Sequence, residues 1–337
     1  MSIRDDIPAL DIAGLGVTFA TLEGDVAAVN DFSLHLHAGE CVGVVGESGA
    51  GKSQSFLAIM GLLAANARLR GSAALQGEPL IVEGRMASSE TLNSLRGSKL
   101  AMIFQDPMTS LTPHLKVGEQ IAESVIHHQG VTRKLARARA LELLHQVQVT
   151  DAERRLDQYP HELSGGMRQR VMIAIALACD PAVLIADEPT TALDVTIQAQ
   201  ILALLAELKR SRGMAMALIT HDLGVVAGVA DRVAVMYGGR IVELGTVNQV
   251  LKSPQHPYTR ALLASMPRLD APETARLQAI SGQPPNPRIL PSGCAFHPRC
   301  DVATEICSRQ RPELVNSLPR VACHHARVST SAAGSAS

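Results

Sequence analysis

The sequence predicts an α/β fold in which helices cover a buried, largely parallel β-sheet. Three observations lead to this prediction. Hydrophobic residues make up 46% of the 337 residues but aromatic residues only 2%, so the core must consist of aliphatic side chains, as in buried parallel strands. The apolar run CVGVV (41–45) leads through a glycine-rich loop into the helical pattern of SQSFLAIMGLLA. Two further apolar runs, AVLIADEP (182–189) and MALITHD (216–222), read as buried strands that end in polar residues.

The glycine-rich loop, GESGAGKS (46–53), fits the pattern G-x-x-x-x-G-K-[ST]. Such a loop directs backbone N–H groups at a phosphate chain, and its glycines allow the close approach. Lys52 would reach the β- and γ-phosphates, and the Ser53 hydroxyl would hold Mg²⁺. A chance glycine turn is the alternative, but the strand before and the helix after favour a P-loop NTPase. The predicted nucleotide-binding residues are Gly46, Glu47, Ser48, Gly49, Ala50, Gly51, Lys52, Ser53 and Gln54.

The remaining elements follow in order. Residues 7 to about 45 alternate apolar runs with turn residues and predict a β-rich region, and LAMIFQDP (100–107) predicts a strand that ends at a proline. From there to about 178 the pattern is helical. One predicted helix has an apolar face of Leu135, Ala138, Leu141 and Leu144. A second, strongly amphipathic helix has an apolar face of Ile197, Ile201, Leu204, Leu205 and Leu208.

The end of the chain changes in character. A hairpin is predicted around Gly238-Gly239. After SPQHPYT the composition shifts to Pro, Arg and Cys, and the final residues predict disorder. We therefore expect an ATPase core at 7–105 and 179–252, a helical subdomain at 106–178, a C-terminal extension at 253–326 and a disordered tail at 327–337.

Charge and hydropathy restrict the class of protein. The net charge is −1, so the chain has no excess of positive charge that would attract the phosphate backbone of a nucleic acid. The longest apolar runs, FLAIMGLLAA and VMIAIALAC, are much shorter than the ~18–20 residues of a membrane span. The N-terminal MSIRDDIPAL has acids and no apolar core of a signal peptide. We expect a cytosolic chain that reaches a membrane only through a partner.

Polar residues follow the predicted strands. Asp187 and Glu188 end one strand; the first could orient the Mg²⁺ shell and the second could polarise water. His221 ends another strand and could hydrogen-bond the γ-phosphate, although a structural histidine is the alternative. Gln105 at the tip of a third strand could contact Mg²⁺ or the attacking water, whereas by itself it would read as a surface residue.

A second anion-receptive helix start lies in LSGGMRQR (163–170), where Ser164 precedes two glycines. One ATP does not need two such sites, so this one would serve an ATP held by another subunit. The alternative is a glycine turn with a serine cap. Asp194, in TALD, follows the two acids by one short turn.

Together these motifs resemble the ABC-transporter ATPases over about residues 10–250, and LSGG is particular to that family. The resemblance implies that residues 46–53 form the Walker A loop and that Ser53, Gln105 and Asp187 surround Mg²⁺. It implies that Glu188 polarises water, with Gln105 as the Q-loop glutamine and His221 as the switch histidine, and that Phe19 stacks on adenine. Two cassettes would meet head to tail, each completing the other's site with the signature and D-loop residues, which are Ser164, Gly165, Gly166, Met167 and Asp194.

Longer sequence segments, such as IADEPTTALDVTIQAQIL and HPYTRALLASMPRLD, resemble the oligopeptide, dipeptide and nickel permease ATPases, and this resemblance extends to about residue 325. This implies a transport ATPase on the cytoplasmic face of the inner membrane. Its partners would be two permease subunits, a second ATPase and, indirectly, an external peptide-binding protein. Segment 106–120 would line the groove for a permease helix. Alternatives are a nickel or other solute importer, or a soluble ABC ATPase of DNA repair or translation.

Six cysteines divide into two groups. Cys41 and Cys179 lie in apolar runs and predict buried core thiols. The other four are separated by 5, 6 and 15 residues, which is not the spacing of a zinc ribbon. Some members of the resembling family carry a [4Fe–4S] cluster there; structural zinc or free thiols are the alternatives, and His297, His324 or His325 could replace a ligand. The candidate cluster ligands are Cys294, Cys300, Cys307 and Cys323.

Overall fold

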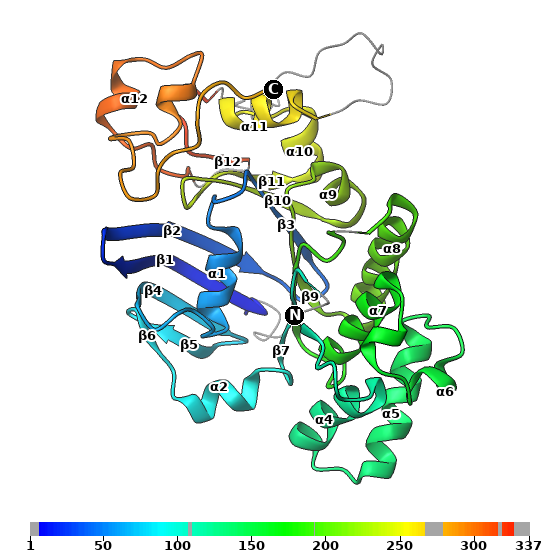
Figure 1. Cartoon of the computed structure of the whole chain (residues 1–337). Helices are drawn as coiled ribbons and strands as arrows, with labels where there is room; N and C mark the ends of the chain where they lie inside the picture. Colours follow the sequence, from blue (N-terminus) through cyan, green and yellow to red (C-terminus); the bar gives the residue numbers. More distant parts are fainter. Residues whose placement is uncertain (1–6, 107–109, 192, 267–278, 316–318, 327–337) are drawn as a thin grey trace, which may run out of the picture.

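The computed structural model of the chain describes residues 7–106, 110–191, 193–266, 279–315 and 319–326. The predicted disordered tail, 327–337, lies outside the described residues. Two β-sheets and several groups of helices make up the described part of the chain (Figure 1). None of the helices in this part is both long and apolar enough to cross a membrane.

The larger sheet has seven strands in the order β12-β11-β10-β3-β9-β8-β7. The five strands from β10 to β7 pair in parallel, and every residue of β3, β8 and β9 is buried. The predicted buried parallel sheet is therefore confirmed. The strands are β3 (Cys41–Val45), β7 (Leu100–Ile103), β8 (Val183–Asp187), β9 (Ala215–Ile219), β10 (Arg232–Tyr237), β11 (Arg240–Thr246) and β12 (Arg320–Val321).

The smaller sheet is antiparallel and has the strand order β2-β1-β4-β5-β6. Helix α1 (Lys52–Ile59) lies between the two sheets (Figure 1), and its Phe56 meets Phe32 edge to face with ring centroids 5.7 Å apart. This contact helps to hold in place the helix that starts at the phosphate loop. The strands are β1 (Leu10–Thr21), β2 (Gly24–Leu36), β4 (Ala67–Leu75), β5 (Glu78–Val82) and β6 (Arg85–Met86), and the short helix α2 (Ser89–Leu95) follows them.

A helical group lies beside the β7 edge of the larger sheet (Figure 1). It consists of α4 (Val117–Gln129), α5 (Arg133–Gln146), α6 (Ala152–Arg155), the 3-10 turn η2 (Pro160–Glu162) and α7 (Gly165–Ala176). Its apolar side chains join one core with those of β8 and of α8 (Val195–Arg212). The signature motif at the start of α7 is therefore held by the same core as the strand that carries Asp187.

The buried face predicted for α5 is wrong in its first half. Leu135 is 59% exposed and Ala138 is exposed, whereas Leu141 packs against the core and Leu144 is buried; the fully buried residues are Ala136, Ala140, Leu143 and Leu144. Steps of three residues rotate by 300° on an α-helix, so the predicted face drifts around the axis, while the observed spacings of four and three keep to one side. The apolar face predicted for α8 is confirmed, because its four residues from Ile201 to Leu208 are buried.

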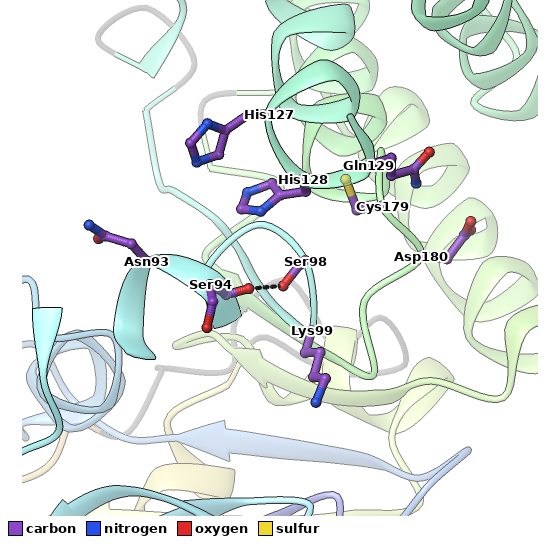
Figure 2. A pocket seen from close by; sticks show the side chains of 9 residues that line it. All are labelled: Asn93, Ser94, Ser98, Lys99, His127, His128, Gln129, Cys179 and Asp180. Atoms are coloured by element: carbon purple, nitrogen blue, oxygen red, sulfur yellow. Dashed lines mark hydrogen bonds between the residues drawn. The ribbon is translucent and has the colours of Figure 1, made fainter. Parts of the chain in front are cut away.

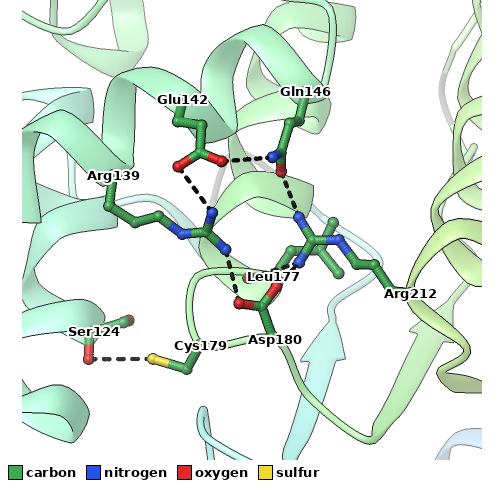
Figure 3. Close-up of polar contacts among 8 residues, drawn as sticks. All are labelled: Ser124, Arg139, Glu142, Gln146, Leu177, Cys179, Asp180 and Arg212. Atoms are coloured by element: carbon green, nitrogen blue, oxygen red, sulfur yellow. Dashed lines mark hydrogen bonds and ion pairs between the residues drawn. The ribbon is translucent and has the colours of Figure 1, made fainter.

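Asp180 joins α5, α8 and the turn before β8 (Figure 3). Its carboxylate pairs with Arg139 at 2.8 Å and also with Arg212. The neighbouring Cys179 is half-buried, and its thiol donates to the Ser124 carbonyl oxygen at 3.5 Å. The prediction of a core thiol is thus wrong for Cys179, which lies at the edge of the apolar core, while Cys41 is fully buried as predicted.

The C-terminal part packs against the β11 edge of the larger sheet (Figure 1). The predicted hairpin at Gly238-Gly239 joins β10 and β11. Strand β12 extends the sheet beyond β11, and the Ala27 N–H donates to the Pro287 carbonyl at 3.0 Å. The helices here are α9 (Leu223–Val229), α10 (Val247–Lys252), α11 (Pro257–Ala264), the 3-10 turn η3 (His297–Arg299) and α12 (Glu305–Arg309).

Candidate active site

The candidate site lies at the carboxyl ends of four adjacent parallel strands. The phosphate loop follows β3, Gln105 follows β7, Asp187 and Glu188 end β8, and His221 follows β9. Ligands bind at this edge in open α/β sheets because the loops there converge. The sheet order therefore brings together residues that are far apart in the sequence.

Two glycines of the phosphate loop are required by its backbone. Gly46 and Gly51 have φ angles of 154° and 92°. A Cβ at Gly46 would lie 2.3 Å from the Met236 carbonyl oxygen, and one at Gly51 would lie 2.3 Å from the Ala28 carbonyl oxygen. No side chain fits at such distances, so the loop folds only with glycine at both positions.

Lys52 begins α1 and turns its side chain back over the loop. Its Nζ donates to the carbonyl oxygens of Gly46 at 2.7 Å and Glu47 at 3.1 Å. The side chain is buried, which lowers the pKa of Lys52, although the carboxylates of Glu188 and Asp187 act in the opposite direction. A partly desolvated ammonium group at this place attracts phosphate strongly.

Ser53 and Asp187 present the oxygens suited to Mg²⁺. The Ser53 hydroxyl donates to Asp187 Oδ1 at 2.9 Å. Burial raises the pKa of Asp187, partly offset by this hydrogen bond. Hydroxyl and carboxylate oxygens are the ligands that Mg²⁺ takes alongside substrate phosphates, so this pair fits the ion.

Glu188 is the centre of the polar contacts. Its carboxylate accepts from Gln105 Nε2 at 3.0 Å and from the Thr191 hydroxyl at 2.8 Å, and His221 Nδ1 lies 3.2 Å away. Burial raises the pKa of Glu188, but the hydrogen bonds from Thr191 and His221 outweigh it, so the pKa lies below its usual value. Glu188 also has a φ of 45°, an uncommon conformation outside glycine that is typical of functional sites.

Thr191 is a site residue that the sequence analysis did not identify. The signal was present, because Thr191 lies in DEPTTALD between Glu188 and Asp194. A hydroxyl three residues after a carboxylate in a tight turn can bond back to it. The structure adds Thr191 as the residue that orients Glu188 from within its own turn.

Ser164 and Asp194 cap the two helices of the signature and D-loop. The Ser164 hydroxyl accepts from the Met167 N–H at 3.4 Å, and the Asp194 carboxylate accepts from the Ile197 N–H at 2.9 Å. Within the part of the chain that the structure describes, their hydrogen bonds stay inside their own helices, away from the phosphate loop. The roles predicted for Ser164, Gly165, Gly166, Met167 and Asp194 toward a partner's nucleotide stay predictions.

The other predicted nucleotide contacts lie near the loop. Phe19 is half-buried on β1 opposite Val26, so its ring is partly free for stacking. Ser48 and Gly49 are exposed, whereas Ala50 is buried and its carbonyl accepts from the Gly239 N–H at 3.2 Å. Gln54 lies half-buried in the first turn of α1. Their contacts with a nucleotide stay predictions.

The four C-terminal cysteines line one cavity of about 10 Å³ together with His256, Phe296, His297, His324 and His325. All four are free thiols, and Cys307 Sγ lies 3.5 Å from His325 Nε2. Burial raises the pKa of Cys294, Cys300 and Cys323. Among the described residues, no three His, Cys, Asp or Glu side chains are arranged to hold a single metal ion.

Two hollows flank the strand that leads to Gln105. One, of about 220 Å³, is lined mostly by apolar residues of β7 and α7, by Phe104 directly after β7, and by Leu111 before α4. The other, of about 580 Å³, lies between α2, the start of β7 and the end of α4, and Figure 2 shows His127 and His128 facing Ser98 across it. The hollows adjoin where Gly97 lies against the His128 ring.

Comparisons with known proteins agree with this geometry. Residues 29–191 match the ABC transporter family, and residues 242–307 match the oligopeptide/dipeptide transporter C-terminal region. The chain is 53% identical to the oligopeptide transport ATP-binding protein OppD of Salmonella typhimurium, over 90% of this chain and 89% of that protein. It is 51% identical to a putative peptide import ATP-binding protein of Brucella melitensis, over 92% of this chain and 94% of that protein.

Solved structures give the same family. The dimeric post-hydrolysis structure of the ATP-binding cassette MJ0796 with ADP and Pi superposes with a TM-score of 0.62 at 27% identity, over 71% of this chain and 98% of that one. The cbiO1 protein of Clostridium perfringens, part of the ABC transporter complex cbiONQ, superposes with a TM-score of 0.61 at 26% identity, over 74% and 92%. The chain belongs to the ATP-binding proteins of the ABC transporter family, in the branch with an oligopeptide/dipeptide transporter C-terminal region.

Proposed function

We propose that this chain is the ATP-hydrolysing subunit of an ABC importer that drives the uptake of oligopeptides or dipeptides. The observation that carries the proposal is the convergence of Lys52, Ser53, Asp187 and Glu188 at one edge of the sheet. The relatives named for oligopeptide transport, at 53% identity, supply the substrate class.

The chemistry assigned to each residue follows from its contacts. The loop amides and Lys52 bind the phosphates, with Ser53 and Asp187 as ligands of the Mg²⁺ that neutralises phosphate charge. Glu188 is ionised at neutral pH, and its hydrogen bonds and nearby positive charges keep its pKa below the usual value despite burial, so it can accept a hydrogen bond from the attacking water and orient it. His221 and Gln105 lie on either side of this carboxylate and restrict where the water can sit.

Gln105 connects hydrolysis to transport in this proposal. Its amide donates to Glu188, and the preceding Phe104 is 39% exposed at the apolar hollow beside β7. A permease helix seated in this hollow would contact Phe104, Ser110 and Leu111 and shift the Gln105 segment. Of the predicted groove segment 106–120, residues 107–109 lie outside the described part.

The ABC family implies transmembrane partners and a pair of cassettes. We infer two permease subunits, a second ATPase that forms a heterodimer with this chain, and an external peptide-binding protein that acts through the permeases. The chain would then be held at the cytoplasmic face of the inner membrane by the permeases. Ser164 and Asp194 support the paired arrangement, because each caps the start of its own helix and, among the described residues, neither side chain bonds to the phosphate loop.

The cysteine-lined cavity supports a [4Fe–4S] cluster as a second cofactor. Cys294, Cys300, Cys307 and Cys323 supply the four thiolates that such a cluster takes. The cavity of about 10 Å³ would have to widen on binding. When bound, the cluster would cross-link the loops of the extension.

The test is reconstitution of the chain with its permeases and partner ATPase in proteoliposomes. ATP should drive the accumulation of a labelled tripeptide, and the variant Glu188→Gln should bind ATP with unchanged Kd while uptake and hydrolysis fall by about 10²–10⁴-fold. Nickel uptake without peptide uptake would contradict the cargo. Normal turnover of Glu188→Gln would contradict its role, and co-purification with ribosomes or DNA-repair proteins instead of permeases would favour a soluble ABC ATPase.

A further inference from the structure

The C-terminal extension contacts the phosphate loop through Arg299. Arg299 Nη1 and Nη2 donate to the two carboxylate oxygens of Glu47 at 2.7 and 3.1 Å. Its remaining N–H groups donate to Tyr237 Oη and to the carbonyl oxygens of Ile280 and Ser281. The Arg299 side chain is 4% exposed and the Glu47 side chain is 25% exposed, so the pair is largely but not fully shielded from water. A bidentate Arg–carboxylate pair of this kind is a strong and directional link.

A second link comes from Tyr258 in the first turn of α11. The backbone N–H of Glu47 donates to Tyr258 Oη at 2.9 Å. Tyr258 is fully buried, and its ring is held against Tyr237 and Phe296 with centroids 4.5 and 5.4 Å apart. Glu47 is thus fixed through both its side chain and its backbone by residues that lie more than two hundred positions later in the chain.

The same residues form one wall of the cysteine-lined cavity. His256 and Phe296 line that cavity, and Cys300 follows Arg299 directly. His256 Nδ1 accepts from the Tyr258 N–H at 3.0 Å, so the histidine that faces the cysteines positions the tyrosine that holds the loop. A continuous set of contacts therefore runs from the cavity to Glu47.

We propose that Tyr258 and Arg299 are positioning residues for the phosphate loop, so that the extension sets the affinity of this chain for nucleotide. The inference rests on the proposed nucleotide-binding role of residues 46–53. It goes beyond that role, because none of the residues predicted to bind the nucleotide lies in the extension.

The physical basis is preorganisation. In this structure Lys52 donates to the carbonyl oxygens of Gly46 and Glu47. The position of the Glu47 backbone therefore affects both the course of the loop and the position of the Lys52 ammonium group. A loop already held in its binding conformation loses less conformational entropy when phosphate binds. If the two links are cut, the binding-competent conformation becomes a smaller fraction of the population, and the apparent Kd rises in proportion.

The test measures the Kd of the full-length chain for a fluorescent ATP analogue with Mg²⁺. Tyr258→Phe removes only the acceptor oxygen and keeps the ring, and Arg299→Gln removes the bidentate pair. Each should weaken binding by roughly tenfold, equivalent to about 1.4 kcal/mol. In the assembled ATPase, KM for ATP should rise while kcat stays near the normal value. Arg299→Lys, which keeps the charge but not the fork geometry, should restore part of the affinity.

Two controls separate positioning from general stability. Arg309→Gln removes an exposed pair with Glu305 inside the extension and should leave the Kd unchanged. Combined with Glu47→Gln, Arg299→Gln should add no further loss, because its partner is already gone. Unchanged Kd in both Tyr258→Phe and Arg299→Gln, or full additivity with Glu47→Gln, would overturn the inference. If Lys52→Ala also bound nucleotide normally, the nucleotide site itself would be wrong.

Discussion

The nucleotide site and the cysteine-bearing extension are built in opposite ways. The first takes its side chains from the ends of β3, β7, β8 and β9, which neighbouring strands hold in register. The second takes them from turns and short helices that are held by an arginine, an aromatic cluster and β12. Regular strands position a site by their pairing alone, whereas the extension depends on individual side chains for its shape.

The two regions also differ in completeness. All four cysteines of the extension come from this chain and line one cavity. The nucleotide site holds its own phosphate loop and acids, while among the described residues the side chain of Ser164, at the start of the signature helix α7, bonds within that helix and not to the phosphate loop. We therefore expect the cysteine-bearing extension to be complete in an isolated chain, and the nucleotide site to hydrolyse ATP only in a pair of cassettes. The predictions below test this contrast.

Among the variants that test this contrast between the two regions, the largest effect should come from Ser164→Arg. The isolated chain should bind ATP with normal affinity, because the Ser164 hydroxyl accepts from the Met167 N–H of its own helix and, in the described part of the chain, does not bond to the phosphate loop. If the signature faces the partner's γ-phosphate as proposed, the assembled pair should lose hydrolysis at the partner's site by about 100-fold, because the bulky side chain removes the Ser164 hydroxyl and blocks access to the neighbouring amides. The measurement is nucleotide Kd of the chain against steady-state hydrolysis of the pair.

Ser164→Thr is the matched control, because it keeps the hydroxyl and the helix cap. It should retain most of the activity. Lost ATP binding in the isolated Ser164→Arg chain would place the signature at its own nucleotide, and unaffected hydrolysis in the pair would refute the shared site.

The contrast also explains what the sequence could predict. Gln105, Asp187, Glu188 and His221 follow apolar runs, and the parallel pairing of those runs brings them together, so a local pattern was sufficient. Arg299 and Tyr258 could not be assigned in this way, because their partner Glu47 is reached through a loop path that no periodicity encodes. Similarly, the sequence identified the four cysteines as a group. It did not indicate that His256 and Phe296 would line the same cavity and connect it to the nucleotide loop.

The face of α5 and the place of Cys179 were mispredicted for a related reason. The burial of the α5 face and of Cys179 depends on how neighbouring elements pack against them, and the local sequence pattern does not contain that information. Leu135 is apolar yet exposed, and Cys179 is held at the edge of the core by a polar contact with Ser124. An apolar residue in a helical pattern indicates burial only if its neighbours on that face are also covered.

An intermediate effect is expected for Cys300→Ser. If the extension binds a [4Fe–4S] cluster, the purified chain should contain about four iron atoms and the variant fewer than one. Thermal unfolding of the extension should also begin at a lower temperature, because the loops lose a cross-link. The measurements are iron and acid-labile sulfide per chain, with Cys179→Ser as the control, since that thiol lies outside the cavity.

Equal iron in the two cysteine variants would exclude the cluster. Zinc in place of iron would favour the structural zinc alternative, and neither metal would leave four free thiols. In each of those cases the contacts of Arg299 and Tyr258 with Glu47 remain, because they involve no cysteine.

The smallest effect is expected for Asp187→Asn, and its direction is counter-intuitive: without nucleotide, the variant should be more stable than the parent chain. Burial raises the pKa of Asp187, with a contribution from the like charge of Glu188, so the ionised carboxylate disfavours the folded state without bound Mg²⁺. A raised folded pKa means that stability from this group is present at low pH and is lost as pH rises through that pKa. Asp187→Asn keeps the acceptor for Ser53 but removes the charge. In the absence of nucleotide its Tm should therefore exceed that of the parent chain by roughly 2–4 °C at neutral pH, the shift that about 1 kcal/mol produces, and the difference should shrink toward pH 4.

With Mg²⁺ and ATP the order should reverse. The parent chain gains stability from the bound ligand, whereas Asp187→Asn loses an ion ligand and gains little. Thermal unfolding across pH, with and without Mg²⁺-ATP, measures both halves. A variant that is less stable than the parent chain at every pH would mean that Asp187 supports the fold through its charge. The nucleotide site would then resemble the extension, whose shape depends on individual charged side chains, more than the regular strands on which it stands.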